Sequence, residues 1–186
     1  MNRVKSCSFT GHRPIHFSFG YEEDHPRCVA LKKKLARTIE ALYLQKGITR
    51  FFTGCALGTD LWAGEAVLFL KNQHQDMKLI CVVPFAVQEK QWSAEQQGRY
   101  FRLLNRSTHV ITLAPDLAGR KMADCYFQRN QYLVNHSDLL FAVYDMEFEG
   151  HSGTEYTVRY ARSQGKPVLF LHPNTFKLSF INGNVV

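Results

Sequence analysis

The sequence has no closely spaced pair of cysteines. Its five cysteines are odd in number and widely spread, most of them lie in apolar runs, and no C-x-x-C pair occurs. A disulfide framework needs paired cysteines, and a structural zinc site needs closely spaced Cys or His ligands. We therefore expect reduced thiols in the core and no metal site. The cysteines are Cys7, Cys28, Cys55, Cys81 and Cys125.

Long apolar runs are also missing. No segment approaches the roughly 18 apolar residues that a membrane span needs, and the opening MNRVKSCSFTGHRP lacks the apolar core of a signal peptide. We expect a cytoplasmic protein without a membrane partner. Linkers, repeats and low-complexity segments are absent as well, and 186 residues suit one well-filled core better than two. The sequence therefore predicts one domain.

Acidic residues are fewer than basic ones, which gives a formal net charge of +7. An excess of Lys and Arg favours polyanionic partners, because binding releases counterions from phosphates. The densest basic run is Lys32-Lys33-Lys34, and it falls opposite the apolar side of an expected helix. We interpret this run as a solvated helix face, so nucleic acid remains a possible but less favoured partner.

Short apolar runs alternate with helical patterns along the whole chain. This order predicts an α/β fold: one doubly wound, Rossmann-like domain with a mostly parallel sheet of about six strands and helices on both faces. The expected strands are residues 4–10, 48–53, 78–83, 109–113, 138–144 and 167–171. The expected helices are residues 26–46, 59–73, 92–105, 121–135 and 153–164.

The C-terminal segment is less clear. Residues 176–186 alternate in polarity around Asn182-Gly183, which is a type I′ turn signal. They form either an edge hairpin or a frayed tail. We therefore place the domain at residues 1–173 and the tail or edge hairpin at residues 174–186.

Glycines and small hydroxyl residues collect where the expected strands end. In open α/β sheets, ligands bind outside the carboxyl ends of the strands, so we expect these loops to share one rim. The first strand leads into Thr10, Gly11, His12 and Arg13, the second into Gly54, Gly58, Thr59 and Asp60, and the fifth into Ser152, Gly153 and Thr154.

Two of these loops reach Gly-Thr at a helix start, at Gly58-Thr59 and at Gly153-Thr154. Backbone N–H groups at a helix N-terminus favour phosphate or carboxylate groups. A single loop of this kind is better explained by a tight turn or a helix cap, and neither loop matches G-x-G-x-x-G or a Walker A motif. Two such loops on one rim favour a ligand site.

The charged residues near the rim have different expected roles. Arg13 is a candidate anion ligand, because its guanidinium offers a planar fork of donors. Asp60, at the first turn of its helix, would repel an anion, so it suits a sugar hydroxyl or a base edge, or else only complements the helix dipole. Glu65 could point towards the rim or away from it. His12 could act as an acid or base, but no nucleophile is evident beside it.

Two further features concern the last two helices. Ser152 and Glu155 have the spacing of a capping box, so a structural role is favoured for Glu155. Arg129 and Asn130 lie inside the helix that precedes the fifth strand. A buried arginine needs an anionic partner, so Arg129 should have one if it faces the rim.

These features together resemble the DUF1273 or YpsA-like family of the SLOG superfamily over nearly the whole chain. The resemblance implies a Rossmann-like fold and a nucleotide or nucleotide-derived ligand, with no certain cofactor. The residues that carry it are Thr10-Gly11-His12-Arg13-Pro14, Gly54 to Glu65, Pro84-Phe85 to Trp92, Arg129-Asn130, Ser137-Asp138 and Gly150 to Thr154.

The superfamily also contains LOG-type phosphoribohydrolases, which cleave the N-glycosidic bond of modified adenosine monophosphates, and DprA-like DNA-processing proteins. The LOG motif P-G-G-x-G-T-x-x-E is similar here at Gly153-Thr154, but Thr157 stands where the catalytic glutamate would be. A carboxylate near the anomeric carbon stabilises an oxocarbenium-like transition state. Hydrolysis would therefore need Glu65, Asp60 or Glu155 instead.

Three functions follow from the sequence. The favoured one is binding of a small nucleotide-like or ADP-ribose-like ligand by a sensor or regulatory protein. The alternatives are nucleotide N-glycoside hydrolysis and single-stranded nucleic-acid binding. The sequence leaves the ligand's identity open, and a homo-oligomer is possible.

Overall fold

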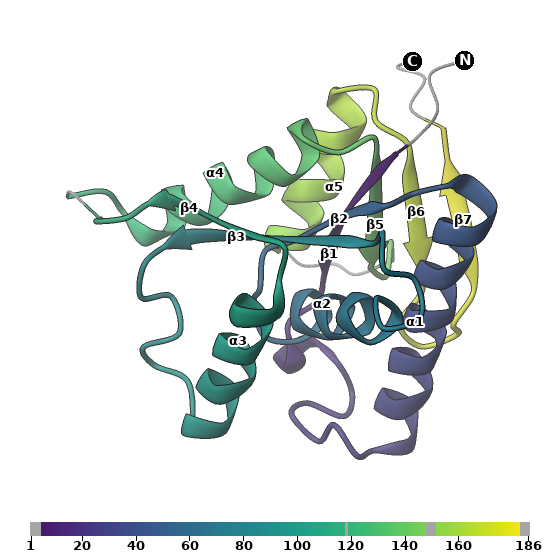
Figure 1. Cartoon of the computed structure of the whole chain (residues 1–186), viewed down its shortest axis with the longest axis horizontal. Helices are drawn as coiled ribbons and strands as arrows, with labels where there is room; N and C mark the ends of the chain where they lie inside the picture. Colours follow the sequence, from purple (N-terminus) through teal and green to yellow (C-terminus); the bar gives the residue numbers. More distant parts are fainter. Residues whose placement is uncertain (1–4, 118, 148–151, 183–186) are drawn as a thin grey trace.

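The predicted alternation of strands and helices is confirmed by a computed structural model of the chain (Figure 1), which describes residues 5–117, 119–147 and 152–182. The strands are β1 (Ser6–Gly11), β2 (Arg50–Thr53), β3 (Lys78–Phe85), β4 (His109–Ala114), β5 (Leu139–Val143), β6 (Val168–Leu171) and β7 (Leu178–Ile181). The helices are α1 (Pro26–Lys46), α2 (Thr59–Leu70), α3 (Ala94–Arg106), α4 (Met122–Asn135) and α5 (Gly153–Ser163), and a 3-10 turn, η1, covers Pro14–His16.

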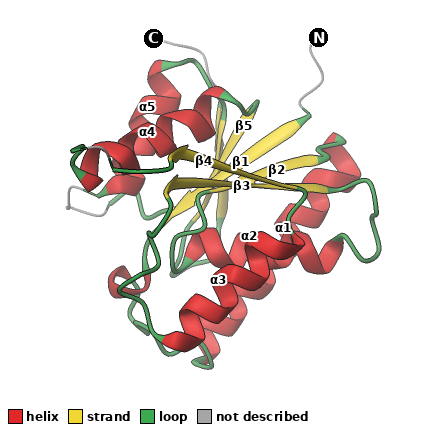
Figure 2. Ribbon diagram, turned by 60° about the vertical axis from the view of Figure 1, so that its left-hand side comes forward, coloured by secondary structure: helices red, strands yellow, loops and turns green. Residues whose placement is uncertain are grey.

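The sheet is mostly parallel and has the strand order β4-β3-β2-β1-β5-β6-β7. Helices α1, α2 and α3 cover one face, and α4 and α5 cover the other (Figure 2). The strand order therefore reverses between β1 and β5, where the chain returns from β4 through α4. Such a switch point opens a crevice at the carboxyl ends of the strands, and the segment after β1 lies beside it, as does the start of α5.

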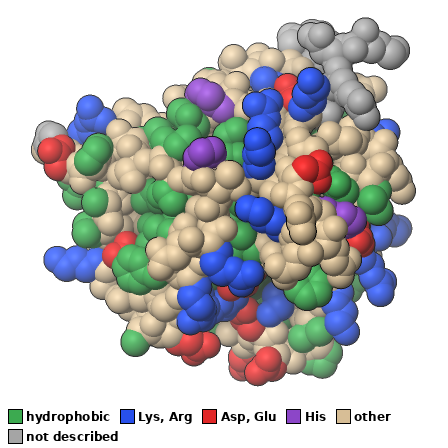
Figure 3. Space-filling view, in the orientation of Figure 1, with side chains coloured by type: hydrophobic (Ala, Val, Ile, Leu, Met, Phe, Trp, Pro, Cys, Tyr) green, Lys and Arg blue, Asp and Glu red, His purple; other side chains and the backbone are tan. Residues whose placement is uncertain are grey.

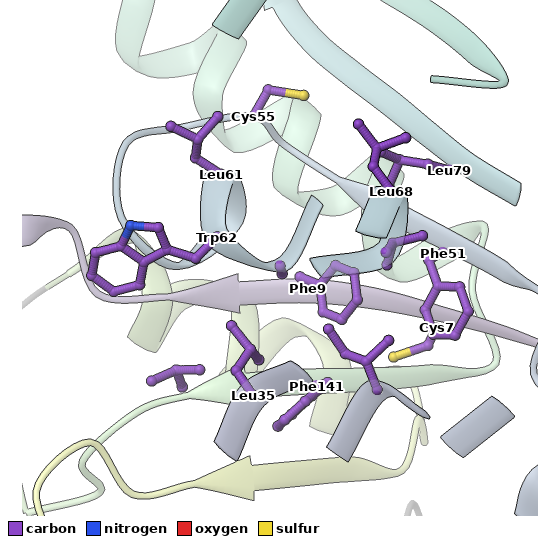
Figure 4. Close-up of a cluster of buried hydrophobic side chains, with 14 of the residues drawn as sticks. Cys7, Phe9, Leu35, Phe51, Cys55, Leu61, Trp62, Leu68, Leu79 and Phe141 are labelled. Atoms are coloured by element: carbon purple, nitrogen blue, oxygen red, sulfur yellow. The ribbon is translucent and has the colours of Figure 1, made fainter. Parts of the chain in front are cut away.

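The core is largest on the face covered by α1 and α2. The ring of Phe9 stacks on Phe51 at a centroid distance of 5.9 Å and lies 6.1 Å from Phe141, so three adjacent strands are joined by aromatic contacts. Figure 4 shows these rings together with Leu35 of α1 and Trp62 of α2. All five cysteines are buried, as expected for core thiols.

Helix α1 has the predicted bounds and the predicted faces. Its buried side includes Leu31, Leu35 and Ile39, while Lys33 and Arg37 are exposed. Lys32 is bound to Glu23 with an Nζ–Oε2 distance of 3.0 Å. On the face drawn in Figure 3, Lys and Arg side chains lie with Asp and Glu side chains among them. The basic run is therefore a solvated helix face that is partly neutralised.

Strand β3 is longer than predicted, because it continues through Pro84 to Phe85. Proline removes a backbone donor and is normally excluded from central strands. Here β3 has a paired strand on both sides only as far as Cys81, where its pairing with β2 ends. Pro84 lies beyond that point. Phe85 still pairs with Ala114 of β4.

The sheet has seven strands where about six were expected. The extra strand, β7, pairs antiparallel with β6, and the connection runs through residues 172–177. The predicted turn at Asn182-Gly183 falls partly outside the described residues. Within the part of the chain that is described, no helix is long and apolar enough to cross a membrane.

Asp138 joins the starts of β1 and β5. Its Oδ2 accepts hydrogen bonds from the backbone N–H groups of Lys5 and Ser6, each at 3.0 Å, and from the Ser6 hydroxyl at 2.7 Å. Burial alone would raise the pKa of the carboxyl. The hydrogen bonds from Ser6 and Lys5 together lower the pKa by more than burial raises it, so the pKa is below its ordinary value. The carboxylate is thus favoured in the folded state.

We expect Asp138→Ala to lower the free energy of unfolding by about 2 kcal/mol, because three donors lose a charged acceptor. A carboxyl whose pKa is lowered on folding adds stability above its unfolded pKa, and that contribution disappears as the pH falls through the lower folded value. The difference from wild type should therefore shrink below about pH 4. Urea unfolding at several pH values checks this, with the exposed Asp116→Ala as control. An equal loss in both variants would contradict the prediction.

Candidate functional site

A cavity of about 910 Å³ opens at the switch point. Its walls are the loops after β1 and β2 and the facing sides of α4 and α5. Of the residues predicted for the site, those that line it are Thr10, Gly11, Arg13, Asp60, Arg129, Asn130, Ser152, Gly153, Thr154 and Glu155. The shared rim expected from the sequence therefore exists for the described residues, while Gly150 and His151 lie outside them.

A buried ion pair forms the floor of the cavity. Arg129 of α4 donates from Nη1 to Oδ2 of Asp60, at the start of α2, over 2.9 Å, and the two side chains are 5% and 9% exposed. Burial raises the pKa of the Asp60 carboxyl above its ordinary value, although Arg129 and Arg13 both act to lower it. Arg129 has the anionic partner that its burial requires. Its Nε, however, is buried and meets no acceptor among the described residues.

Gly54 lies directly against this ion pair. A Cβ atom at this position would lie 1.3 Å from Arg129 Nη1 and 2.7 Å from Asp60 Oδ2. Only glycine leaves room for the guanidinium, so the first glycine of the loop is needed for close approach. The neighbouring Cys55 has a φ of 56°, and its N–H is held by the Thr53 hydroxyl at 3.2 Å.

The loop after β1 is tied to the start of α2. The Thr59 hydroxyl donates to the His12 carbonyl oxygen at 3.2 Å. Gly58 has a φ of 90°, and a Cβ there would lie 2.8 Å from the same oxygen. The rim is therefore supported from outside the cavity by four predicted site residues: His12, Gly54, Gly58 and Thr59. They are not among its lining residues.

His12 is 2% exposed, and its ring packs beside Tyr144 and Phe17. Burial, and to a smaller extent the His16 charge, lower its pKa to about 4, while Asp145 acts in the opposite direction. The imidazole is therefore neutral near pH 7. Charge on His12 cannot be what attracts an anion to this rim.

Aromatic side chains line the cavity, and the sequence analysis missed them. The Tyr126 ring has the guanidinium carbons of Arg13 and Arg129 at 5.3 and 5.9 Å from its centroid. Phe127, on the same helix as Tyr126, and Tyr156 of α5 have ring centroids 4.6 Å apart. Residues 126, 129 and 130 share a helix face at the spacing i, i+3 and i+4. Because Arg129 was already a predicted site residue, this spacing could have indicated that Tyr126 lies at the site as well.

The start of α5 forms the opposite side. The Ser152 hydroxyl accepts from the Glu155 N–H at 3.1 Å, as the capping spacing predicted. Asn130 of α4 donates to the Gly153 carbonyl oxygen at 3.4 Å, so the two helices are linked at the rim. Glu155 lies 3.6 Å from Arg159, one turn later.

The candidate Glu65, and Thr157 at the position of the LOG glutamate, do not line the cavity. Glu65 points away from the cavity and binds Arg99 of α3 in a bidentate pair at 2.9 and 2.7 Å. Thr157 is fully buried and donates to the Gly153 carbonyl at 2.6 Å. Within the described residues, no group of three or more His, Cys, Asp or Glu side chains could hold a metal ion.

Comparisons with known proteins place the chain in a family. The model of the YspA SLOG family matches residues 7–176. An uncharacterised SPbeta prophage-derived protein, YoqJ, of Bacillus subtilis strain 168 is 36% identical over an alignment of 160 positions, and the match covers 81% of this chain and 92% of that protein. A UPF0398 protein of Bacillus thuringiensis strain Al Hakam is 29% identical over 163 residues, covering 88% and 85% of the two chains.

Among solved structures, DNA processing protein A from Helicobacter pylori superposes with a TM-score of 0.54 and 19% identity. The match covers 92% of this chain but 66% of that one, so this chain spans just under two thirds of its length. That structure was described for its mode of binding single-stranded DNA. At this identity the likeness shows the Rossmann-like fold.

We expect Gly54→Ala to destabilise the protein by about 3 kcal/mol, because the added methyl must displace the Arg129 guanidinium from a buried ion pair. Thermal or urea unfolding measures the change. Gly98→Ala in α3 is the matched control, since its Cβ would meet only Arg102 Nη1 at 3.5 Å. Alanine should stabilise that exposed helix by up to about 1 kcal/mol. Similar stabilities for Gly54→Ala and wild type would contradict the close packing described here.

Proposed function

The chain belongs to the YspA SLOG family, and on that premise we propose that it binds a small nucleotide-like or ADP-ribose-like ligand in the rim cavity. The observation that carries the proposal is the pairing of guanidinium groups with aromatic faces in one cavity, at Arg13, Arg129 and Tyr126. Guanidinium groups bind phosphates, and aromatic rings stack on bases. A nucleotide carries both the phosphate and the base that these two kinds of side chain bind.

The phosphate fits best between Arg13 and the start of α5. Gly153 and Thr154 are at the N-terminal end of an 11-residue helix, where backbone N–H groups favour anions. Arg13 is exposed at the cavity wall, so its guanidinium can turn towards an anion without breaking an ion pair with a described residue. The phosphate therefore belongs to this side and away from Asp60.

A sugar or base edge fits the buried ion pair. Asp60 is already bound by Arg129, and the Ala56 backbone N–H also acts on its carboxylate. The pair still presents carboxylate oxygen and guanidinium N–H groups at the cavity floor. The unmatched Nε of Arg129 is a buried donor that a ligand oxygen could satisfy.

Binding is favoured over N-glycoside hydrolysis, and a sensor or regulatory role follows from that. Of the three candidate carboxylates, Glu65 is held by Arg99, and Asp60 is held by Arg129. Glu155 lines the cavity and is the remaining candidate for the hydrolase alternative. Incubation with AMP tests this alternative, because release of free adenine that is lost in Glu155→Gln would establish catalysis.

Single-stranded nucleic acid is the second candidate, because the cavity alternates arginines with aromatic rings. Arg13, Tyr126 and Phe127 lie on one side, and Tyr156 and Arg159 lie on the other. Strand binding uses such stacking rings along a basic groove. The structural neighbour from Helicobacter pylori supports the same candidate.

We expect Arg13→Ala to weaken binding of AMP and ADP-ribose by about tenfold to a hundredfold, since a charge-assisted hydrogen bond to phosphate is lost. Isothermal titration calorimetry measures the change. Arg102→Ala, an exposed arginine of α3 outside the cavity, should bind like wild type. A wild-type protein that binds neither compound would overturn the proposal.

Strand binding makes a different prediction. If an oligothymidylate is the true ligand, its affinity should fall steeply with salt, because each phosphate contact releases counterions. Fluorescence anisotropy between 50 and 200 mM salt separates strand binding from binding of a small nucleotide. Over this range, about 10³ in affinity is lost for extensive phosphate contacts. Salt-sensitive oligonucleotide binding without AMP binding would favour the second candidate.

A further inference from the structure

A second cavity, of about 720 Å³, adjoins the first on the same rim. It lies over the end of β3 and is closed by the segments that lead from β3 to α3 and from β4 to α4. Arg13, Leu57 and Tyr126 line both cavities. The two hollows therefore meet at an arginine and an aromatic ring.

The second cavity has a different chemistry from the first. Its rim carries large apolar side chains that are unusually exposed: Tyr21, Val87 and Met122 are 60%, 51% and 54% accessible. The Trp92 ring and the buried Phe85 contribute further apolar surface. No Asp or Glu is among its described lining residues, and its cations are Arg13 and Lys90. This surface suits a flat, uncharged ring.

Amide side chains supply the polar contacts of the second cavity. Gln88, Gln91 and Gln96 all line it. Gln88 is 6% exposed, and its buried amide lies beside the Tyr100 hydroxyl. Amides can pair with the donor and acceptor edge of a nucleobase or of a carboxamide ring.

We propose that the second cavity binds the second ring of a two-part ligand whose other half occupies the first cavity. The two halves would be nucleoside-like, and the phosphates that join them would lie at Arg13, where the cavities meet. This inference rests on the proposed function and narrows the ligand class to dinucleotide-like compounds. It also explains why Tyr21, Val87 and Met122 are exposed, since exposed apolar side chains do not stabilise the fold.

The test compares AMP, a one-ring probe, with NADH, whose second ring, a dihydronicotinamide, is uncharged and is joined to the adenosine by a diphosphate. Calorimetry on the full chain should show NADH binding about tenfold or more tightly than AMP, since a second ring is stacked. Met122→Glu and Val87→Glu place a carboxylate at exposed positions of the second cavity only. Each should reduce NADH affinity to the level of AMP and leave AMP affinity unchanged.

The control is Phe101→Glu, a similarly exposed apolar position on α3 that lines neither cavity. Equal affinity of the wild type for AMP and NADH, or full NADH affinity in the variants, would overturn the two-ring inference while AMP binding still supported the first site. A wild-type protein that binds neither AMP nor NADH would overturn the proposed function as well. Oligothymidylate binding that the same variants abolish, without tighter binding of NADH than of AMP, would overturn the two-ring inference and assign the second cavity to a strand.

Discussion

The ion pair between Asp60 and Arg129 is the interaction on which the rim is built. It joins α2, on one face of the sheet, to α4, on the other, across the carboxyl end of β2. Breaking a buried pair by removing one partner leaves an uncompensated charge and is strongly destabilising, by about 3–5 kcal/mol. The loop after β2 must therefore keep the conformation that Gly54 and Gly58 allow. The fixed conformation of this loop in turn determines the shape of the cavity above the ion pair.

The fold was largely predictable because its signals are local. Helix α1 begins at Pro26 and ends at Lys46 as the apolar spacing indicates, and its basic residues face outward. Two details of the sheet depend on non-local pairing. Whether Pro84 belongs to β3 depends on where β2 stops pairing. The alternation of residues 176–186 allowed an edge hairpin or a frayed tail, and the antiparallel pairing of β7 with β6 shows that residues 178–181 form an edge strand.

The site was predictable where glycine, hydroxyl and charge mark the strand ends, and less so where it depends on tertiary packing. The orientation of Glu65 was open in the sequence, and Arg99, 34 residues away, decides it. Tyr126 and Tyr156 are separated by 30 positions, and only the contact of α4 with α5 places them around one cavity. Aromatic residues are common in cores, so their positions alone did not indicate a stacking surface.

The charges that line the first cavity limit which of the proposed ligands it could hold. Three arginines and two carboxylates are among its described lining residues, and one arginine is neutralised by Asp60. Glu155 lies against Arg159 at 3.6 Å, which leaves Arg13 as the guanidinium without a carboxylate partner among these lining residues. One such group and one helix N-terminus suit one or two phosphates, and a triphosphate would bring more negative charge than they can balance. The electrostatics therefore favour a mononucleotide or a diphosphate-linked ligand.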